Sequence, residues 1–327
     1  MDYSNKELKV DRVNKEDKEE ILKLLDTVFS SQQMVKNISR GKNFWNWKYE
    51  NNPFGQAKLH KIIHDDKIIG CGTLWPFQFK FKEKVLNAYQ PCDTIILKEY
   101  RGKGLFSKLN KKRILTAGED NIDFLFNFPN AQSLPGYQKM GWVFLGKIQW
   151  YVKVLQPWKV FNSSIRNHKS EILDVPEKFS IKVKFNFNDN IFIKDKISLI
   201  KNYDFFSWRF KNRPNRNYGV LDIDGHFVIF TLMKKGEMIE MIIVEFNVSP
   251  KYYSQMLRLI TKEAKAMGVS YIALTKPNNS SKWEFFKNQF FPLKNKNFVI
   301  KQISNVLPPE VLNLSSWNFS LALHDSI

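Results

Sequence analysis

Cysteine and long apolar runs are scarce in this sequence, and each scarcity excludes a class of protein. The 327 residues include only two cysteines, Cys71 and Cys92, which cannot form a disulfide framework or a cysteine-rich metal site. No apolar stretch approaches the roughly 18 to 20 residues that cross a bilayer, and the first residues are charged. The sequence therefore predicts a cytoplasmic protein with no membrane span and no metal.

Acidic residues are also in the minority. The chain has 51 Lys and Arg against 32 Asp and Glu, a net charge of +19. Such an excess suits nucleic acid, an anionic membrane surface or small anionic molecules. Because both halves of the chain share the excess, no dedicated basic arm stands out. Nucleic acid binding stays open as the minority interpretation.

The most informative stretch is a strand, a glycine turn and a helix in immediate succession. Residues 94–97 form a β-branched apolar run, residues 101–104 read Arg-Gly-Lys-Gly, and helical periodicity starts at Leu105. A glycine turn before a helix favours anion binding, because unpaired backbone N–H groups and the helix dipole point toward the ligand. Arg101 and Lys103 add positive charge. The alternative is a basic turn before an ordinary surface helix.

This order resembles the coenzyme A pyrophosphate loop of the GCN5-related N-acetyltransferase (GNAT) family, whose pattern is Gln/Arg-x-x-Gly-x-Gly/Ala. Arg101 and Gly104 match that pattern, whereas Phe106 stands where the family has its last small residue. The resemblance implies acetyl-CoA as co-substrate. The residues that it assigns to the cofactor here are Ile95, Ile96, Leu97, Arg101, Gly102, Lys103, Gly104, Leu105 and Phe106.

A second segment resembles another motif of the same family, an Asn on a loop followed by Tyr-x-Lys-x-Gly-Phe. Asn130, Tyr137, Lys139, Gly141 and Trp142 occupy the matching places. The resemblance implies that Asn130 contributes to the cofactor site and that Tyr137 protonates the departing thiolate. The structural alternative is that Tyr137 simply packs on the sheet.

The general base is less clearly marked than the acid. Asp93 lies on the strand before the glycine turn and is our candidate for this catalytic role, although it could equally pair with a lysine. His60 and His64 fall in a predicted hairpin, where packed or surface histidines are common. In some tandem GNAT proteins the chain's C-terminus supplies the base, so the tail 324–327 is a further hypothesis.

The chain repeats itself. Residues 205–214 copy the aromatic pattern of residues 44–53, and the predicted elements then recur in the same order. In the second half Pro250 follows the strand and no glycine precedes the helix, so this half is predicted not to bind coenzyme A. The motif has one tryptophan in each half, Trp47 and Trp208. Its presence in the half that is predicted not to bind coenzyme A favours a structural role over ligand stacking.

The sequence as a whole predicts an α/β protein of two tandem GNAT-like domains with mixed sheets, the second degenerate in its CoA loop. The expected boundaries are an acetyl-CoA domain over 1–156, a linker over 157–176 and a degenerate domain over 177–327. The resemblance to tandem proteins of bacterial polysaccharide biosynthesis implies an N-acyltransferase acting on a small amine, such as an amino sugar or nucleotide-linked amino sugar. The alternatives are aminoacyl transfer from tRNA, as in Fem-like proteins, and a non-catalytic binding protein.

Overall fold

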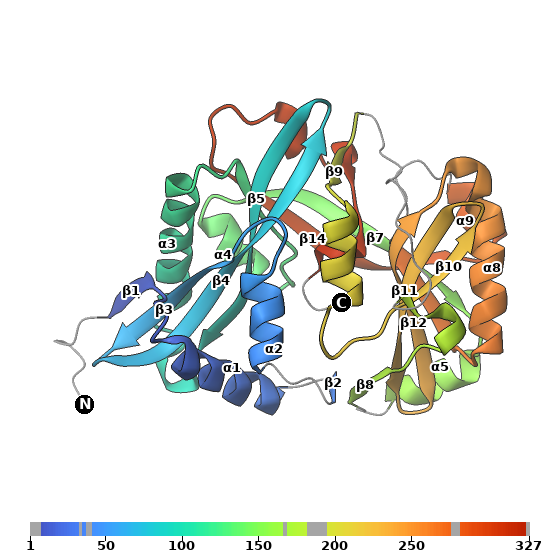
Figure 1. Cartoon of the computed structure of the whole chain (residues 1–327), viewed down its shortest axis with the longest axis horizontal. Helices are drawn as coiled ribbons and strands as arrows, with labels where there is room; N and C mark the ends of the chain where they lie inside the picture. Colours follow the sequence, from blue (N-terminus) through green and yellow to red (C-terminus); the bar gives the residue numbers. More distant parts are fainter. Residues whose placement is uncertain are drawn as a thin grey trace. The chain divides into compact units, whose positions relative to one another are not determined.

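The computed structural model describes residues 8–32, 35–36, 41–165, 169–181, 195–275 and 282–324. The chain forms two compact units, each a mixed α/β fold around β-strands (Figure 1). Unit 1 comprises Met1–Gln32, Ser39–Gly146 and Asn297–Leu314, and unit 2 comprises Gln33–Ile38, Lys147–Lys296 and Ser315–Ile327. None of the described helices is long and apolar enough to cross a membrane.

Strands and helices follow one another along the sequence of unit 1. These are β1 (Lys9–Arg12), α1 (Lys18–Gln32), α2 (Lys42–Trp45), β3 (Lys58–His64), β4 (Lys67–Phe81), β5 (Lys84–Ile96), α3 (Leu105–Glu119), β6 (Phe124–Asn127) and α4 (Leu134–Lys139). β1, β3, β4 and β5 pair antiparallel in that order, and β6 joins β5 in parallel. The sheet is therefore mixed, as expected.

Two helices cover opposite faces of this sheet because side chains alternate along a strand. Ile68 on β4 packs in the cluster that contains Leu25 of α1. Its neighbour Ile69 packs with Leu105 and Leu109 of α3. The glycine turn thus leads into a helix that is anchored on the sheet.

Unit 2 repeats the order around its own strands. Its elements are β2 (Val35–Lys36), β7 (Val143–Val154, from Lys147 on), α5 (Pro157–Ile165), β8 (Ser170–Leu173), β9 (Ile197–Leu199), α7 (Tyr203–Phe206), β10 (Gly219–Ile223), β11 (His226–Lys235), β12 (Met238–Asn247), α8 (Tyr253–Ala266), β13 (Tyr271–Thr275), α9 (Lys282–Lys287), β14 (Phe291–Gln302, to Lys296) and β15 (Trp317–Asn318). β10, β11 and β12 form the antiparallel meander, and β13 adds to β12 in parallel.

The two halves exchange their last strands. In unit 1 the later part of β14 pairs antiparallel with β6, so that Ile300 lies opposite Phe126. In unit 2 β7 pairs antiparallel with β13, and Val152 lies opposite Ala273. Each unit is therefore built from segments that alternate along the sequence, whereas the predicted boundaries give each domain one continuous segment.

Two segments differ from the sequence-based expectation. The predicted linker 157–176 contains α5 and β8, because Pro157 occupies the first turn of a helix, where its missing N–H costs nothing. Residues 317–323 alternate in a pattern that predicts a single strand, but the strand ends at Asn318. Ser320 accepts the Ala322 N–H and starts the 3₁₀ turn Leu321–Leu323.

The duplicated aromatic motif forms a π-helical turn in each unit, at Asn46–Glu50 and Ser207–Lys211. Trp47 and Trp208 are both buried, and each packs edge-on or tilted against a neighbouring ring. This burial supports their structural role.

Candidate active site

The glycine turn has the backbone geometry of an anion-binding loop. Gly102 and Gly104 have φ of 78° and 72°, in the left-handed region that favours glycine, and Gly104 is the N-cap of α3. A Cβ added at either position would meet nothing within 4 Å, so the backbone borders open space. The turn is exposed, with Arg101 and Lys103 beside it. The first N–H groups of α3 therefore face a region where an anion can approach.

In the strand before the turn, some backbone groups bond to β4 and others face away from it. The Leu97 N–H donates to Ile69 O at 2.9 Å, so Leu97 is bonded toward β4. Alternation along a strand turns the backbone of Ile96 away from β4. Its carbonyl accepts Arg101 Nε at 3.0 Å on that side. Of the three predicted strand residues, Ile96 is the one whose backbone faces away from the hairpin.

A β-bulge interrupts β5 just before this point. Thr73 lies opposite Cys92 and Cys71 lies opposite Ile95, so Asp93 and Thr94 together oppose a single β4 residue, Gly72. Asp93 has a φ of 44°. The predicted catalytic carboxylate therefore sits at the most irregular place on the strand.

A buried ion pair holds the Asp93 side chain. Lys48 Nζ lies 2.6 Å from Asp93 Oδ2, and each side chain is only 2% exposed. The Tyr49 hydroxyl donates to the same carboxylate oxygen at 2.8 Å. Both partners come from the π-helical turn, so the duplicated motif ties α2 to the bulge. The lysine pairing was one of the two outcomes that the sequence left open for Asp93.

An arginine lies on the other side of the bulge. Arg113 of α3 is completely buried and donates from Nη2 to Cys92 O at 3.1 Å. A Cβ on Gly72 would lie 2.1 Å from that nitrogen, so only glycine leaves room for it. Burial lowers the pKa of Arg113. The signal in the sequence was a basic residue four positions after Leu109 on the apolar face of a helix, and our sequence analysis missed it.

Tyr137 lies where α4 meets α3 and the end of β6. Its ring packs edge-on against Phe106 and Trp142, with centroid distances of 5.8 Å and 4.9 Å. Gly136 lies next to Phe106, the departure from the family pattern, because a Cβ on Gly136 would be 3.7 Å from the Phe106 ring, an ordinary contact distance. Asn127 Nδ2 donates to the Tyr137 hydroxyl oxygen at 2.6 Å. Sequence reasoning missed Asn127, a lone polar residue at the end of an apolar strand.

Asn130 is exposed and shapes the start of α4. Its Oδ1 accepts the Ser133 N–H at 2.9 Å and the Ser133 hydroxyl at 3.0 Å. Its carbonyl accepts the Leu134 N–H. The structure thus brings Tyr137 and Phe106 into contact, while it gives the Asn130 side chain a role in the turn.

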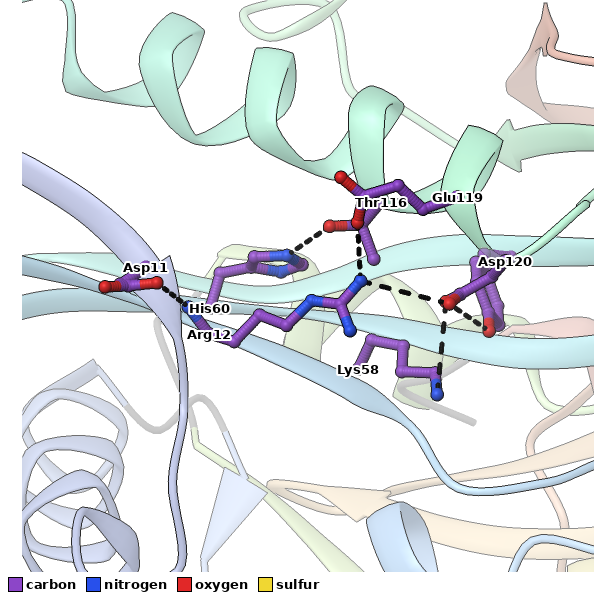
Figure 2. Close-up of polar contacts among 8 residues, drawn as sticks. Asp11, Arg12, Lys58, His60, Thr116, Glu119 and Asp120 are labelled. Carbon is purple, nitrogen blue, oxygen red and sulfur yellow. Dashed lines mark hydrogen bonds and ion pairs between the residues drawn. The ribbon is translucent and has the colours of Figure 1, made fainter.

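Figure 2 shows the polar contacts around His60 of β3, between the edge strand β1 and helix α3. His60 Nε2 and Thr116 Oγ1 are 2.9 Å apart, and burial, followed by the charge of Arg113, lowers the pKa of His60 to about 3. The imidazole is therefore neutral at physiological pH and a poor proton acceptor. Beside it, Arg12 Nη2 contacts Glu119 at 2.7 Å.

A groove of about 680 Å³ opens beside the π-helical turn of unit 1. Its basic lining residues are Arg12, Lys15, Lys18 and Lys58, and Tyr49 also borders it. Glu50 is the acidic lining residue and lies 2.6 Å from Lys18 Nζ. The charged side chains of the groove are therefore mainly cationic, and apolar residues, among them Val13, Trp45 and Leu59, line the rest. Among the described residues, no three His, Cys, Asp or Glu side chains are grouped to hold a metal ion.

In unit 2 the chain's own C-terminal segment fills the corresponding place. Ile229 lies opposite Glu245 and Phe230 opposite Ile243, so β12 has a bulge next to a buried acid, as β5 does. Lys201 Nζ contacts Glu245 at 2.6 Å, and the Ser320 hydroxyl donates to it at 2.7 Å.

This segment is fastened by the second copy of the aromatic motif. Arg209, at the place of Lys48 in the motif, donates to Ala322 O at 3.0 Å and to His324 O at 2.9 Å. A cavity of only about 30 Å³ remains between β12, β13 and residues 318–320. Residues 325–327, which end the predicted catalytic tail, lie outside the described residues.

Comparison with known proteins agrees with this geometry. Residues 9–145 match the family model described as an acetyltransferase (GNAT) domain. No curated protein matches the chain.

Three solved structures show the same fold over most of the chain. A protein from Enterococcus faecalis V583 described as a probable N-acyltransferase has 12% identity and a TM-score of 0.62, covering 91% of this chain and 73% of that one. A GCN5-related N-acetyltransferase from Anabaena variabilis has 14% identity and a TM-score of 0.61, with the same coverages. Saccharomyces cerevisiae N-myristoyltransferase with bound myristoyl-CoA has 12% identity and a TM-score of 0.53, covering 90% and 82%.

The chain therefore has the fold of proteins that are described as N-acyltransferases and N-acetyltransferases. More particularly, residues 9–145 match an acetyltransferase (GNAT) domain, the family that the two sequence motifs resemble. The expected α/β fold with tandem GNAT-like halves is confirmed.

Proposed function

We propose that unit 1 binds acetyl-CoA at the turn 101–106 and transfers the acetyl group to a small amine. The observation that carries this proposal is the pair of left-handed, exposed glycines at the start of α3. Their N–H groups suit the pyrophosphate, with Arg101 and Lys103 as charge partners. Ile96, at the end of the strand, offers its backbone N–H to the pantetheine, because its carbonyl already accepts Arg101 Nε.

The chemical step uses Tyr137 as general acid. The amine nitrogen attacks the thioester carbon, an N–C bond forms, the C–S bond breaks and sulfur keeps the electron pair. Tyr137 gives its proton to that sulfur, and the attacking nitrogen releases one proton to solvent. The phenolate of Tyr137 then takes up one proton from solvent, so that no net proton is gained or lost. The contact of Tyr137 with Phe106, which follows the proposed pyrophosphate loop, supports this assignment.

We assign Asp93 a structural role in holding the bulge. Its carboxylate could accept a proton only if its contacts with Lys48 and Tyr49 were broken. Its ion pair with Lys48 and the Tyr49 hydrogen bond stabilise the charged carboxylate and so weaken it as a base. The low pKa of His60 argues against that residue too. The acceptor amine therefore reaches its neutral form by losing its proton to solvent.

For the acceptor we propose an amino sugar that carries an anionic group, such as a nucleotide-linked amino sugar. The resemblance to proteins of polysaccharide biosynthesis suggests the sugar. The basic groove beside Tyr49 supports the anionic group, because Arg12, Lys15 and Lys58 line it. A cytoplasmic location would supply acetyl-CoA.

The donor is tested first, by native mass spectrometry of the purified full-length chain. A bound CoA species would support the proposal, and its mass would give the acyl length. Thiol release from acetyl-CoA is then measured with glucosamine and with glucosamine 6-phosphate, two amines that differ only in the phosphate. We expect a lower KM for the phosphorylated amine. Activity that depends on charged tRNA, or no thiol release with any amine, would overturn the proposed reaction.

A further inference from the structure

The side chain of Asn127 bridges β5 and Tyr137. Asn127 ends β6, and its Nδ2 donates to Pro91 O at 3.0 Å and to the Tyr137 hydroxyl oxygen at 2.6 Å. Its Oδ1 accepts the Phe128 N–H at 2.8 Å. Three hydrogen bonds therefore fix one small side chain.

These partners also fix which way the amide points. A backbone N–H can only donate and a carbonyl can only accept, so Oδ1 must face Phe128 and Nδ2 must face Pro91. The Tyr137 oxygen, bonded by the same Nδ2, is consequently the acceptor of that hydrogen bond. The single proton of the phenol must then point away from Asn127.

The bridge crosses the sheet where β5 and β6 stop pairing. The parallel register places Ala88 opposite Phe124 and Tyr89 opposite Leu125. Asn127 and Pro91 each lie two residues beyond the last of these pairs, and Asp93 of the bulge follows closely. The Asn127 amide thus lies beside Tyr137, the proposed general acid, at the place where β5 and β6 diverge. The thioester is proposed to lie at the same place.

We infer that Asn127 is a positioning residue that turns the Tyr137 proton toward the departing sulfur and stabilises the phenolate left behind. This inference rests on the proposed function. The ring itself is held by Phe106 and Trp142, so packing and orientation have different sources. Loss of the amide should therefore affect proton transfer more than folding.

Thiol release from acetyl-CoA tests the inference in four proteins: wild type, Asn127→Ala, Tyr137→Phe and the double variant. Asn127→Ala should lower kcat about tenfold with an unchanged KM for acetyl-CoA, which is only part of the roughly 10²- to 10⁴-fold that a general acid contributes. In the Tyr137→Phe background the same change should have no further effect, because the proton that Asn127 directs is already gone. Effects that multiply in the double variant would overturn the inference.

Two measurements separate the orientation of the phenol proton from packing: a variant that replaces the amide donor with an acceptor, and a pH profile. In Asn127→Asp a carboxylate oxygen replaces Nδ2 and accepts the phenol proton, so kcat should fall further than in Asn127→Ala. The alkaline limb of kcat should move to higher pH in Asn127→Ala, since the phenolate loses a donor. An unmoved limb would contradict the assignment.

The matched control is Asn297→Ala. Asn297 Nδ2 also donates to a proline carbonyl in unit 1, Pro129 O at 3.0 Å, and this variant should keep wild-type kcat. If Tyr137→Phe is inactive while Asn127→Ala is normal, only the present inference fails. If Tyr137→Phe keeps full kcat, the acid in the proposed function fails and Asn127 loses its role with it.

Discussion

Gly104 is the single residue on which donor binding should depend most. Its φ of 72° costs a residue with a Cβ roughly 1 to 2 kcal/mol, and a β-branched side chain would also enter the space that the pyrophosphate needs. Gly104→Val should therefore weaken acetyl-CoA binding about tenfold or more, since 1.4 kcal/mol is a factor of ten. Calorimetry measures this affinity.

The matched control is Gly118→Val, because Gly118 lies inside α3 and also has nothing within 4 Å of an added Cβ. Equal affinities in the two variants would remove the loop from the donor site.

Tyr137 carries the second prediction at this scale. If its proton goes to the leaving sulfur, Tyr137→Phe should lower kcat by about 10²-fold, while the dissociation constant for acetyl-CoA changes little. Steady-state kinetics and calorimetry on the same preparation provide both numbers. A variant with normal turnover would return Tyr137 to a packing role.

His60 makes stability depend on pH. Its pKa is about 3 in the folded chain against 6.5 ordinarily, so below pH 6.5 the unfolded chain binds a proton that the folded chain refuses. The contribution is present above pH 6.5 and is lost as pH falls toward 3, by about 1.4 kcal/mol per pH unit.

Urea unfolding at pH 5 and pH 7 tests this. Between these two values, wild type should lose about 2 kcal/mol more than His60→Gln. Identical pH dependence in both proteins would show that His60 titrates normally.

At the scale of elements, the link between the π-helical turn and the bulge should matter for stability. Lys48→Met would leave the Asp93 carboxylate buried without its cation, which costs about 3 to 5 kcal/mol. The control is Lys18→Met, because the Lys18–Glu50 pair is partly exposed and should contribute less than about 1 kcal/mol. Denaturant unfolding gives both values, and similar losses in the two variants would contradict the prediction.

The elements also show what a sequence can and cannot predict. The strand, turn and helix at 94–105 were predictable because glycine, basic residues and apolar periodicity are local signals. The exchange of β7 and β14 was not, because both are twelve-residue strands and the choice of partner depends on distant residues. The bulge partner Arg113 and the bridge at Asn127 depend likewise on contacts between separate elements.

At the scale of the whole molecule, the two units should differ in ligand binding. Unit 2 has Pro250 where unit 1 has its glycine turn, and residues 318–320 leave a cavity of about 30 Å³, room for little more than one water. Calorimetry should therefore find one acetyl-CoA per chain, and Gly104→Val should weaken that one site. A second site that survives in Gly104→Val would show that unit 2 binds the donor as well.

The exchanged strand also constrains when the molecule can be finished during translation. Unit 1 includes Asn297–Leu314, which the ribosome makes after 150 intervening residues that follow the earlier segments, Met1–Gln32 and Ser39–Gly146. Domains usually fold as they emerge, at about 5 to 20 residues per second. Here β6 lacks its neighbour in β14 until the 150 residues between the last two segments of unit 1 have been made. A ribosome that stops before Asn297 should thus release a chain whose unit 1 is still missing a strand.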